Sequence, residues 1–212
     1  MKLRSTAVKQ VCRPEKQLLY LLIGHFLKQD REYDVALDLA CGPMPLADKI
    51  RARRYIGVDI NEESLRKGMA AHPSAVAIHS SIERIADDIT ADLVLCFQCI
   101  GVNSDFHVDN TIKCVRRTVN ATRTGGALLF NVGPLARDYF DEIETTLKQA
   151  FGHITVIQYG RFYERRAPMT ALLLAHVMYY LPFLARNSAR PSRLYVCQDR
   201  NPVTVNRIPL AA

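Results

Sequence analysis

The chain has 212 residues, of which 49% are apolar and 23% are charged. This composition is that of an ordinary globular protein with a hydrophobic core, so it excludes a largely disordered or low-complexity chain. The length suits one domain over residues 1–212, because a second independent core would have too few residues. The net charge of +7 permits an acidic partner such as RNA or anionic lipid, although the arginine clusters are short and a solvated surface is the simpler interpretation of them.

The six cysteines and the first residues favour a cytoplasmic location. Most of the cysteines lie inside apolar runs, as free core thiols do, and the N-terminus lacks the continuous apolar core of a signal peptide. The most apolar stretch, residues 171–184, is shorter than the ~20 residues that a membrane-spanning helix needs. We therefore expect no transmembrane segment.

Apolar periodicity predicts alternating helices and strands in the first half of the chain. The expected elements are a helix at 14–29, a strand at 35–40, a short helix at 46–53, a strand at 55–60 and a helix from its N-cap Asn61 to about 72. A strand at 75–79, a short helix at 82–89 and a strand at 91–99 follow.

The second half continues the alternation. The expected elements are a helix at 109–122 that Gly125 and Gly126 stop, then a strand at 127–132, a helix at 139–151, a strand at 153–159, a helix at 170–185 and a strand at 193–197. Because the strands are apolar on both faces, the pattern predicts an α/β protein whose mostly parallel sheet is covered by helices on both sides.

Open sheets of this kind bind ligands beyond the carboxyl ends of their strands, which draws attention to the exit of the first strand. Asp38 lies in that strand and Cys41-Gly42-Pro43 follows it, while Asp59 ends the second strand. A tight turn lets the backbone approach a ligand, and an acid at the next strand end can accept hydrogen bonds from ribose hydroxyls. The G-x-G-x-x-G pattern of dinucleotide sites is absent, which disfavours hydride-transfer enzymes.

Five segments follow one another along the alternating pattern: the run 37–43 and the segments 55–61, 79–83, 91–98 and 125–130. In this order they resemble motifs of the class I S-adenosylmethionine (SAM)-dependent methyltransferases, and the run 37–43 is similar to the family's glycine-rich loop. The resemblance implies a single-domain Rossmann-like three-layer α/β/α sandwich. It also implies a seven-stranded, mostly parallel sheet with an antiparallel last strand, and SAM as the cofactor.

The resemblance assigns cofactor-binding residues by position: Asp38, Ala40, Cys41 and Gly42 in the loop, Asp59 and Ile60 at the ribose, Ser81 and Ile82 at the adenine, and Phe97 and Gln98 after the fourth strand. Two positions depart from the family pattern. Met44 replaces the last glycine of the loop, where its side chain is expected to crowd the methionine part of SAM. Ser81 stands where an aspartate often binds the adenine amino group, and a hydroxyl binds that group more weakly.

Candidate acceptor-side residues come from three places. His107, between Asp105 and Asp109, is a candidate catalytic base, although a loop histidine is often only a surface residue. Tyr20 belongs to an N-terminal helical cap over residues 1–30, and Tyr179 to a helical insertion over 168–186 between the last two strands. Both are candidate substrate-binding residues, and packing alone is the alternative.

The 168–186 insertion is unusual for this family, which ordinarily has a short hairpin there. A lid, a homodimer face and an apolar substrate pocket are the functional interpretations, and ordinary core packing is the alternative. With the nearby Arg161, Arg165 and Arg166, an apolar wall would suit a lipid-like or amphipathic acceptor.

The leading hypothesis is O- or N-methylation of a small-molecule acceptor, such as an apolar or amphipathic metabolite. The alternatives are an RNA methyltransferase, motivated by the charge, and a non-catalytic SAM-fold binding or scaffold protein. Cys96 and Cys99 have C-x-x-C spacing, but no second pair accompanies them, so we interpret them as core thiols and expect no metal. The absence of N-P-P-Y-like and Pro-Cys sequences disfavours methylation of adenine amino groups and of cytosine carbon 5.

Overall fold

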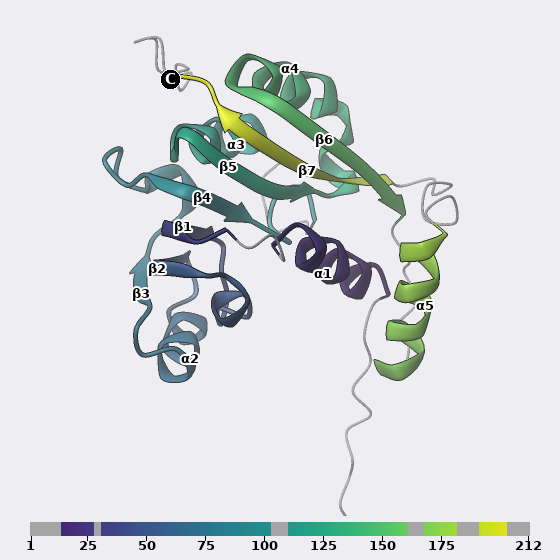
Figure 1. The fold of residues 1–212 in the computed structure, drawn as a ribbon, viewed down its shortest axis with the longest axis horizontal. Helices are drawn as coiled ribbons and strands as arrows, with labels where there is room; N and C mark the ends of the chain where they lie inside the picture. Colours follow the sequence, from purple (N-terminus) through teal and green to yellow (C-terminus); the bar gives the residue numbers. More distant parts are fainter. Residues whose placement is uncertain (1–13, 28–30, 103–109, 161–167, 182–190, 203–212) are drawn as a thin grey trace, which may run out of the picture.

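The computed structural model describes residues 14–27, 31–102, 110–160, 168–181 and 191–202. Figure 1 shows one twisted sheet with helices packed on its two faces. The strands are β1 (Tyr33–Leu39), β2 (Ala52–Asp59), β3 (Val76–His79), β4 (Ala91–Cys96), β5 (Thr122–Val132), β6 (Phe151–Gly160) and β7 (Pro191–Arg200). The α-helices of the described residues are α1 (Pro14–Leu27), α2 (Glu62–Ala71), α3 (Thr111–Asn120), α4 (Phe140–Ala150) and α5 (Pro168–Tyr180).

The sheet has seven strands in the order β3-β2-β1-β4-β5-β7-β6. Strands β1 to β5 run parallel to one another, and β7 runs antiparallel to both β5 and β6. The predicted Rossmann-like sandwich with an antiparallel last strand is therefore confirmed. Because β1 lies between β2 and β4, the strand order reverses at β1: β2 and β3 follow on one side of β1, and β4 and β5 follow on the other. The loops after β1 and β4 consequently diverge at the place where such sheets bind ligands.

Alternate residues of each strand enter one of two hydrophobic layers. On one face, Leu37 and Leu39 of β1 pack with residues of α3 and α4. On the other face, Ala36 packs with residues of α1, α2 and α5. This alternation follows from the period of two in an extended strand, and it explains why the strand sequences are apolar on both sides.

The predicted helix over 46–53 is wrong. Only a single 3-10 turn, Ala47–Lys49, forms there, and β2 already begins at Ala52. Ala52 pairs with Tyr33 and Arg54 with Val35 in a parallel ladder, so residues 52–54 extend the sheet although two of the three are arginines. Tertiary pairing with β1 outweighs the helix propensity of the local sequence.

The expected role of Gly125 and Gly126 as a helix stop is also wrong. Helix α3 has already ended at Asn120, and both glycines lie inside β5. Gly125 has φ +71°, and a Cβ at Gly126 would lie 2.8 Å from the Arg123 carbonyl and 2.9 Å from that of Asp92. The register between β4 and β5 shifts in this region, so the glycines permit an irregular, close approach of the two strands.

Helix α5 lies between β6 and β7, within the segment 168–186, and it packs beside α1 (Figure 1). The Tyr179 hydroxyl lies 3.0 Å from His25 Nδ1 of α1, and the two rings meet edge to face. None of the helices that the structure describes is long and apolar enough to cross a membrane.

Candidate functional site

The loop after β1 has an unusual backbone. Ala40, Gly42 and Met44 have φ values of 57°, 54° and 55°, so every second residue occupies the left-handed region. The loop is fixed to β2, because the Cys41 amide donates to the Val58 carbonyl at 3.0 Å. It closes with a bond from the Met44 amide to the Cys41 carbonyl at 3.1 Å. Left-handed backbone is unfavourable for residues with a Cβ, so the surrounding contacts must hold this loop in shape.

Met44 does not project into the loop's ligand side, contrary to the expectation that it crowds a bound molecule. Its side chain is fully buried and packs between β2 and α2. Two glycines provide the space: a Cβ at Gly57 would lie 2.7 Å from Met44 Cε, and one at Gly68 would lie 2.9 Å from Met44 Cγ. The missing loop glycine is thus compensated by glycines on the two neighbouring elements.

We expect Gly68→Ala to destabilise the fold by ~1–3 kcal/mol, because the new methyl group would overpack against Met44 and the Pro43 backbone. Gly24→Ala is the matched control, since Gly24 also lies inside a helix but has open space around its Cβ position. That control should gain ~0.5–1 kcal/mol from helix propensity alone. Denaturant unfolding of both variants measures the difference, and equal stabilisation would show that Met44 moves aside freely.

Asp59 is held by two backbone amides at the carboxyl end of β2. Its Oδ2 accepts from Gly42 N at 2.7 Å, and its Oδ1 accepts from Asn61 N at 2.8 Å. Asn61 itself caps α2, because its side chain accepts from Ser64 N at 2.9 Å, as predicted. The carboxylate of Asp59 is therefore not used as the helix cap. It joins the β1 loop to the β2 exit and retains acceptor capacity, because a carboxylate offers about four lone-pair sites.

Asp38 is a buried carboxyl group beneath the same loop. Its Oδ2 accepts a 2.5 Å hydrogen bond from the hydroxyl of Tyr55 on β2. Burial raises the pKa of Asp38 to about 7; the Tyr55 hydrogen bond opposes this rise, and the charge of Asp59 adds to it. The group is thus neutral or charged near physiological pH according to what lies beside it, and a cation in contact would favour the charged form.

A cavity of about 190 Å³ lies over the loop. Its lining comes from α1, the end of β1, the loop and the exit of β4: Lys16, Tyr20, Asp38, Ala40, Cys41, Gly42, Pro43, Pro45, Leu46, Phe97 and Gln98. Burial and the charge of Asp38 raise the pKa of the Tyr20 hydroxyl. Six of the predicted cofactor-binding residues and the predicted substrate residue Tyr20 are therefore brought together. Sequence reasoning missed Lys16, whose position depends on how α1 folds over the sheet.

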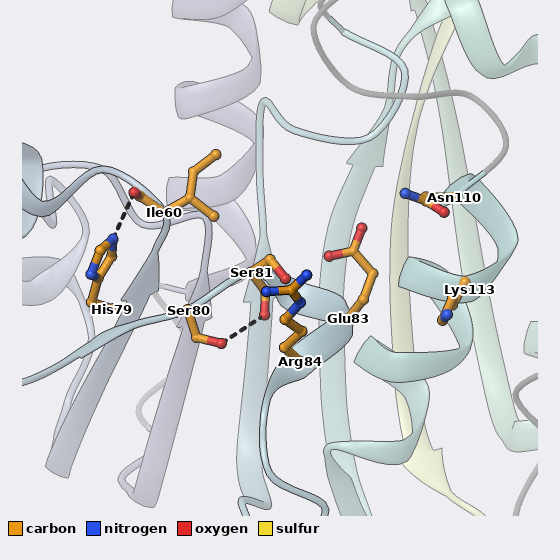
Figure 2. Close-up of a pocket in the computed structure, with 8 residues that line it drawn as sticks. All are labelled: Ile60, His79, Ser80, Ser81, Glu83, Arg84, Asn110 and Lys113. Atoms are coloured by element: carbon orange, nitrogen blue, oxygen red, sulfur yellow. Dashed lines mark hydrogen bonds between the residues drawn. The ribbon is translucent and has the colours of Figure 1, made fainter.

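A second, wider cavity of about 690 Å³ is lined by Ile60, just beyond Asp59, by the end of β3 and the segment after it, and by the start of α3. Ile60 is 71% exposed, which is unusual for a large apolar side chain, and its carbonyl lies 2.9 Å from His79 Nε2. Figure 2 shows Ser81 and Glu83 facing the start of α3 across the cavity. The remaining lining residues are Ser80, Arg84, Asn110 and Lys113. The predicted Ser81 lines this cavity together with Glu83 of the same segment, and no sequence motif pointed to Arg84 or Lys113.

The exit of β4 is shaped by a buried asparagine. Gln98 has φ +59°, and its amide donates to Asn131 Oδ1 on β5 at 2.7 Å. Asn131 in turn donates from Nδ2 to the Tyr159 hydroxyl on β6 at 3.1 Å. This chain of polar contacts across the sheet fixes the turn that carries Phe97 and Gln98 to the first cavity. Asn131 escaped sequence reasoning because it lies inside an apolar strand.

The other predicted site residues have different surroundings. Ile82 is buried in the hydrophobic layer with α3 and does not line either cavity. Tyr179 contacts His25 and is likewise absent from both linings. His107 lies outside the described residues. Cys96 and Cys99 are free thiols, and within the described ranges no three His, Cys, Asp or Glu side chains form a group that could hold a metal ion.

The fold of the chain is the fold of solved methyltransferases, some of them determined with bound S-adenosylhomocysteine (SAH). N-methyltransferase NodS from Bradyrhizobium japonicum WM9, in complex with SAH, superposes with a TM-score of 0.59 at 13% identity, over 89% of this chain and 87% of that one. The plantazolicin methyltransferase BamL, in complex with a triazolic desmethylPZN analogue and SAH, gives 0.57 at 14% identity, over 87% and 86%.

An rRNA methylase from Streptococcus thermophilus is also similar, with a TM-score of 0.54 at 13% identity, over 84% of this chain and 94% of that one. No protein-family model and no curated protein sequence matches the chain. At these identities the similarity establishes the fold, and the activity must be argued from the site.

Proposed function

We propose that the protein is a SAM-dependent methyltransferase acting on a small-molecule acceptor. The observation that carries the proposal is the Asp59 carboxylate, which accepts from the amides of Gly42 and Asn61. Asp59 is in neither cavity's lining, but its partner Gly42 lines the loop cavity and the adjacent Ile60 lines the wider one. Two of its roughly four acceptor sites are occupied by these amides. The others are available to the vicinal hydroxyls of a ribose, so an adenosyl group would extend from here into the wider cavity.

The described residues fit the rest of SAM. The exposed Ile60 side chain offers an apolar surface for adenine, and Ser81 and Glu83 offer acceptors for its amino group. On the other side of Asp59, the buried Asp38 would bind the ammonium group of the methionine part. Lys16 lines the same cavity and would bind its carboxylate. The fully buried side chain of Met44 leaves this space clear.

The chemistry required of the protein is mostly alignment. SAM, when bound, supplies a methyl group on a positively charged sulfur. The acceptor would attack the methyl carbon in line with the carbon–sulfur bond, and the sulfur would leave as part of neutral SAH. Phe97 is largely buried and lines the first cavity with Tyr20, so both would exclude water and hold an acceptor. His107 remains the proposed base that removes a proton from the acceptor.

A small acceptor is supported by the aromatic side chains of Tyr20 and Phe97, which line the loop cavity and offer an apolar surface beside the reacting group. NodS is an N-methyltransferase, and BamL was crystallised with a desmethylPZN analogue, so the same fold serves such chemistry. The second candidate is an RNA methyltransferase, favoured by the net charge of +7 and by the similarity to the rRNA methylase. A non-catalytic SAM-binding protein is the third.

Calorimetry with SAM and SAH tests the shared premise. We expect both to bind. If neither SAM nor SAH binds, the enzyme assignment is wrong. Transfer of a labelled methyl group to a pool of small metabolites, compared with transfer to tRNA and rRNA, then separates the first two candidates. RNA binding that falls steeply with added salt, accompanied by labelled RNA, would replace the small acceptor by RNA. Binding of SAM with no labelled product in either pool would favour the non-catalytic protein.

A further inference from the structure

Helix α5 is apolar on two opposite faces. Ala171, Ala175 and Met178 are buried against α1 and the sheet. The opposite face, together with the residue after the helix, carries six exposed large apolar side chains, which we name the outer stripe: Met169, Leu172, Leu173, Val177, Tyr180 and Leu181. The helix sequence contains no Asp, Glu, Lys or Arg. A helix at a protein surface ordinarily presents polar residues to water, so the outer stripe needs a partner.

The stripe is continuous along the helix. Its members recur at spacings of three and four residues, which places them on one face over roughly 18 Å. Met169 and Tyr180 near its two ends are 77% and 74% exposed, and Leu173 between them is 67% exposed. Together the six side chains present on the order of 600 Å² of surface, which is at the upper limit of the apolar patches found on monomers.

Charge distinguishes between the possible partners. The sequence on either side of α5, residues 161–167 and 182–190, contains five arginines and one glutamate. An uncharged apolar helix next to cationic sequence complements a surface that combines hydrocarbon with negative charge. The surface of a bilayer that contains anionic lipid has this combination.

A second copy of the chain fits less well. A stable protein interface buries ~800 Å² on each partner, which is more than the outer stripe offers. Two copies that met through α5 would also bring together two chains of net charge +7. Both considerations disfavour a homodimer through this face.

We propose that the outer stripe of α5 docks onto the surface of anionic membranes, with the helix lying in the plane of the interface. At 13 residues, α5 is too short to span a bilayer, so it contacts only the boundary between headgroups and acyl chains. Because α5 packs on α1, which contributes Lys16 and Tyr20 to the loop cavity, docking would hold that cavity close to the membrane.

Vesicle co-sedimentation of the full chain tests the proposal. We expect binding to phosphatidylglycerol vesicles at least ~10-fold tighter than to phosphatidylcholine vesicles, weakening as salt is raised. The double variant Met169→Glu, Leu173→Glu should lose at least ~10-fold in affinity for the anionic vesicles. Leu135→Glu is the control, because Leu135 is an exposed apolar residue far from α5 in sequence. This variant should bind the vesicles as the wild type does.

Thermal melting and SAH binding establish that the variants are folded, and neither readout depends on lipid. Absence of vesicle binding by the wild type would overturn the proposal. The proposal would also be overturned if the double variant bound the anionic vesicles as tightly as the wild type. A concentration-dependent dimer in sedimentation analysis that the double variant abolishes would show instead that the outer stripe is an interface between two copies.

Discussion

Replacing Asp59 with asparagine is expected to lower the affinity for SAH on the order of 100-fold, because the variant loses charge-assisted hydrogen bonds to two ribose hydroxyls. The reason lies in the bonding of the carboxylate. Gly42 and Asn61 each donate an amide to a different oxygen of Asp59. An asparagine side chain has only one oxygen, so its amino group would face one of these donors. The variant therefore loses both the negative charge and the geometry of the β1 loop.

Calorimetric titration with SAH measures this effect, and Asp138→Asn is its control. Asp138 is a solvent-exposed acid paired with Arg137 in a different part of the molecule, so its neutralisation changes the net charge equally. We expect the control to bind SAH as the wild type does. Wild-type affinity in Asp59→Asn would remove Asp59 from the site and would leave its two hydrogen bonds as a purely structural link.

Replacing Asp38 with asparagine is expected to stabilise the folded protein at high pH. The pKa of Asp38 is raised from 3.8 to about 7 on folding, chiefly because burial disfavours the charge. The contribution of this group to stability is therefore fully present below pH ~4 and is lost as the pH rises to ~7. The neutral asparagine avoids that loss, so the variant should exceed the wild type at pH 8 by on the order of 4 kcal/mol.

The same substitution is expected to abolish tight SAH binding. In the wild type, Asp38 must be ionised to pair with the ligand's ammonium group, so SAH affinity should rise between pH 6 and pH 8 and be pH-independent in Asp38→Asn. Tyr55→Phe provides the complementary variant, because it removes the hydrogen bond that lowers the pKa of Asp38. The midpoint of the affinity profile should then move to higher pH. A flat wild-type profile would contradict this role for Asp38.

Features that depend only on residues close together in the sequence could be predicted well. The apolar runs of β1 and β4 identify buried parallel strands, and the position of Asp59 at the end of β2 depends only on that pattern. Asn61 before Glu62 and Glu63 is a capping signal that no distant residue can change, and the structure has the cap. The location of the candidate site, beyond the carboxyl ends of the strands next to β1, follows from strand order alone.

Features set by distant contacts could not be predicted. The early start of β2 depends on pairing with β1, and the environment of Met44 depends on glycines in β2 and α2. Lys16 reaches the loop cavity only because α1 crosses the sheet, and its sequence surroundings carry no sign of this. Asn131 is hidden in an apolar strand, although a polar residue among buried ones is a signal that could have been followed.

The packing of Met44 against two glycines links three positions that are distant in sequence. If a relative of this chain carries glycine at the position of Met44, the space beside β2 and α2 would be empty unless larger residues filled it. We therefore expect substitutions at the positions of Met44, Gly57 and Gly68 to covary among relatives, with side-chain volume gained at one position and lost at another. A set of homologous sequences would then identify this arrangement without any structure.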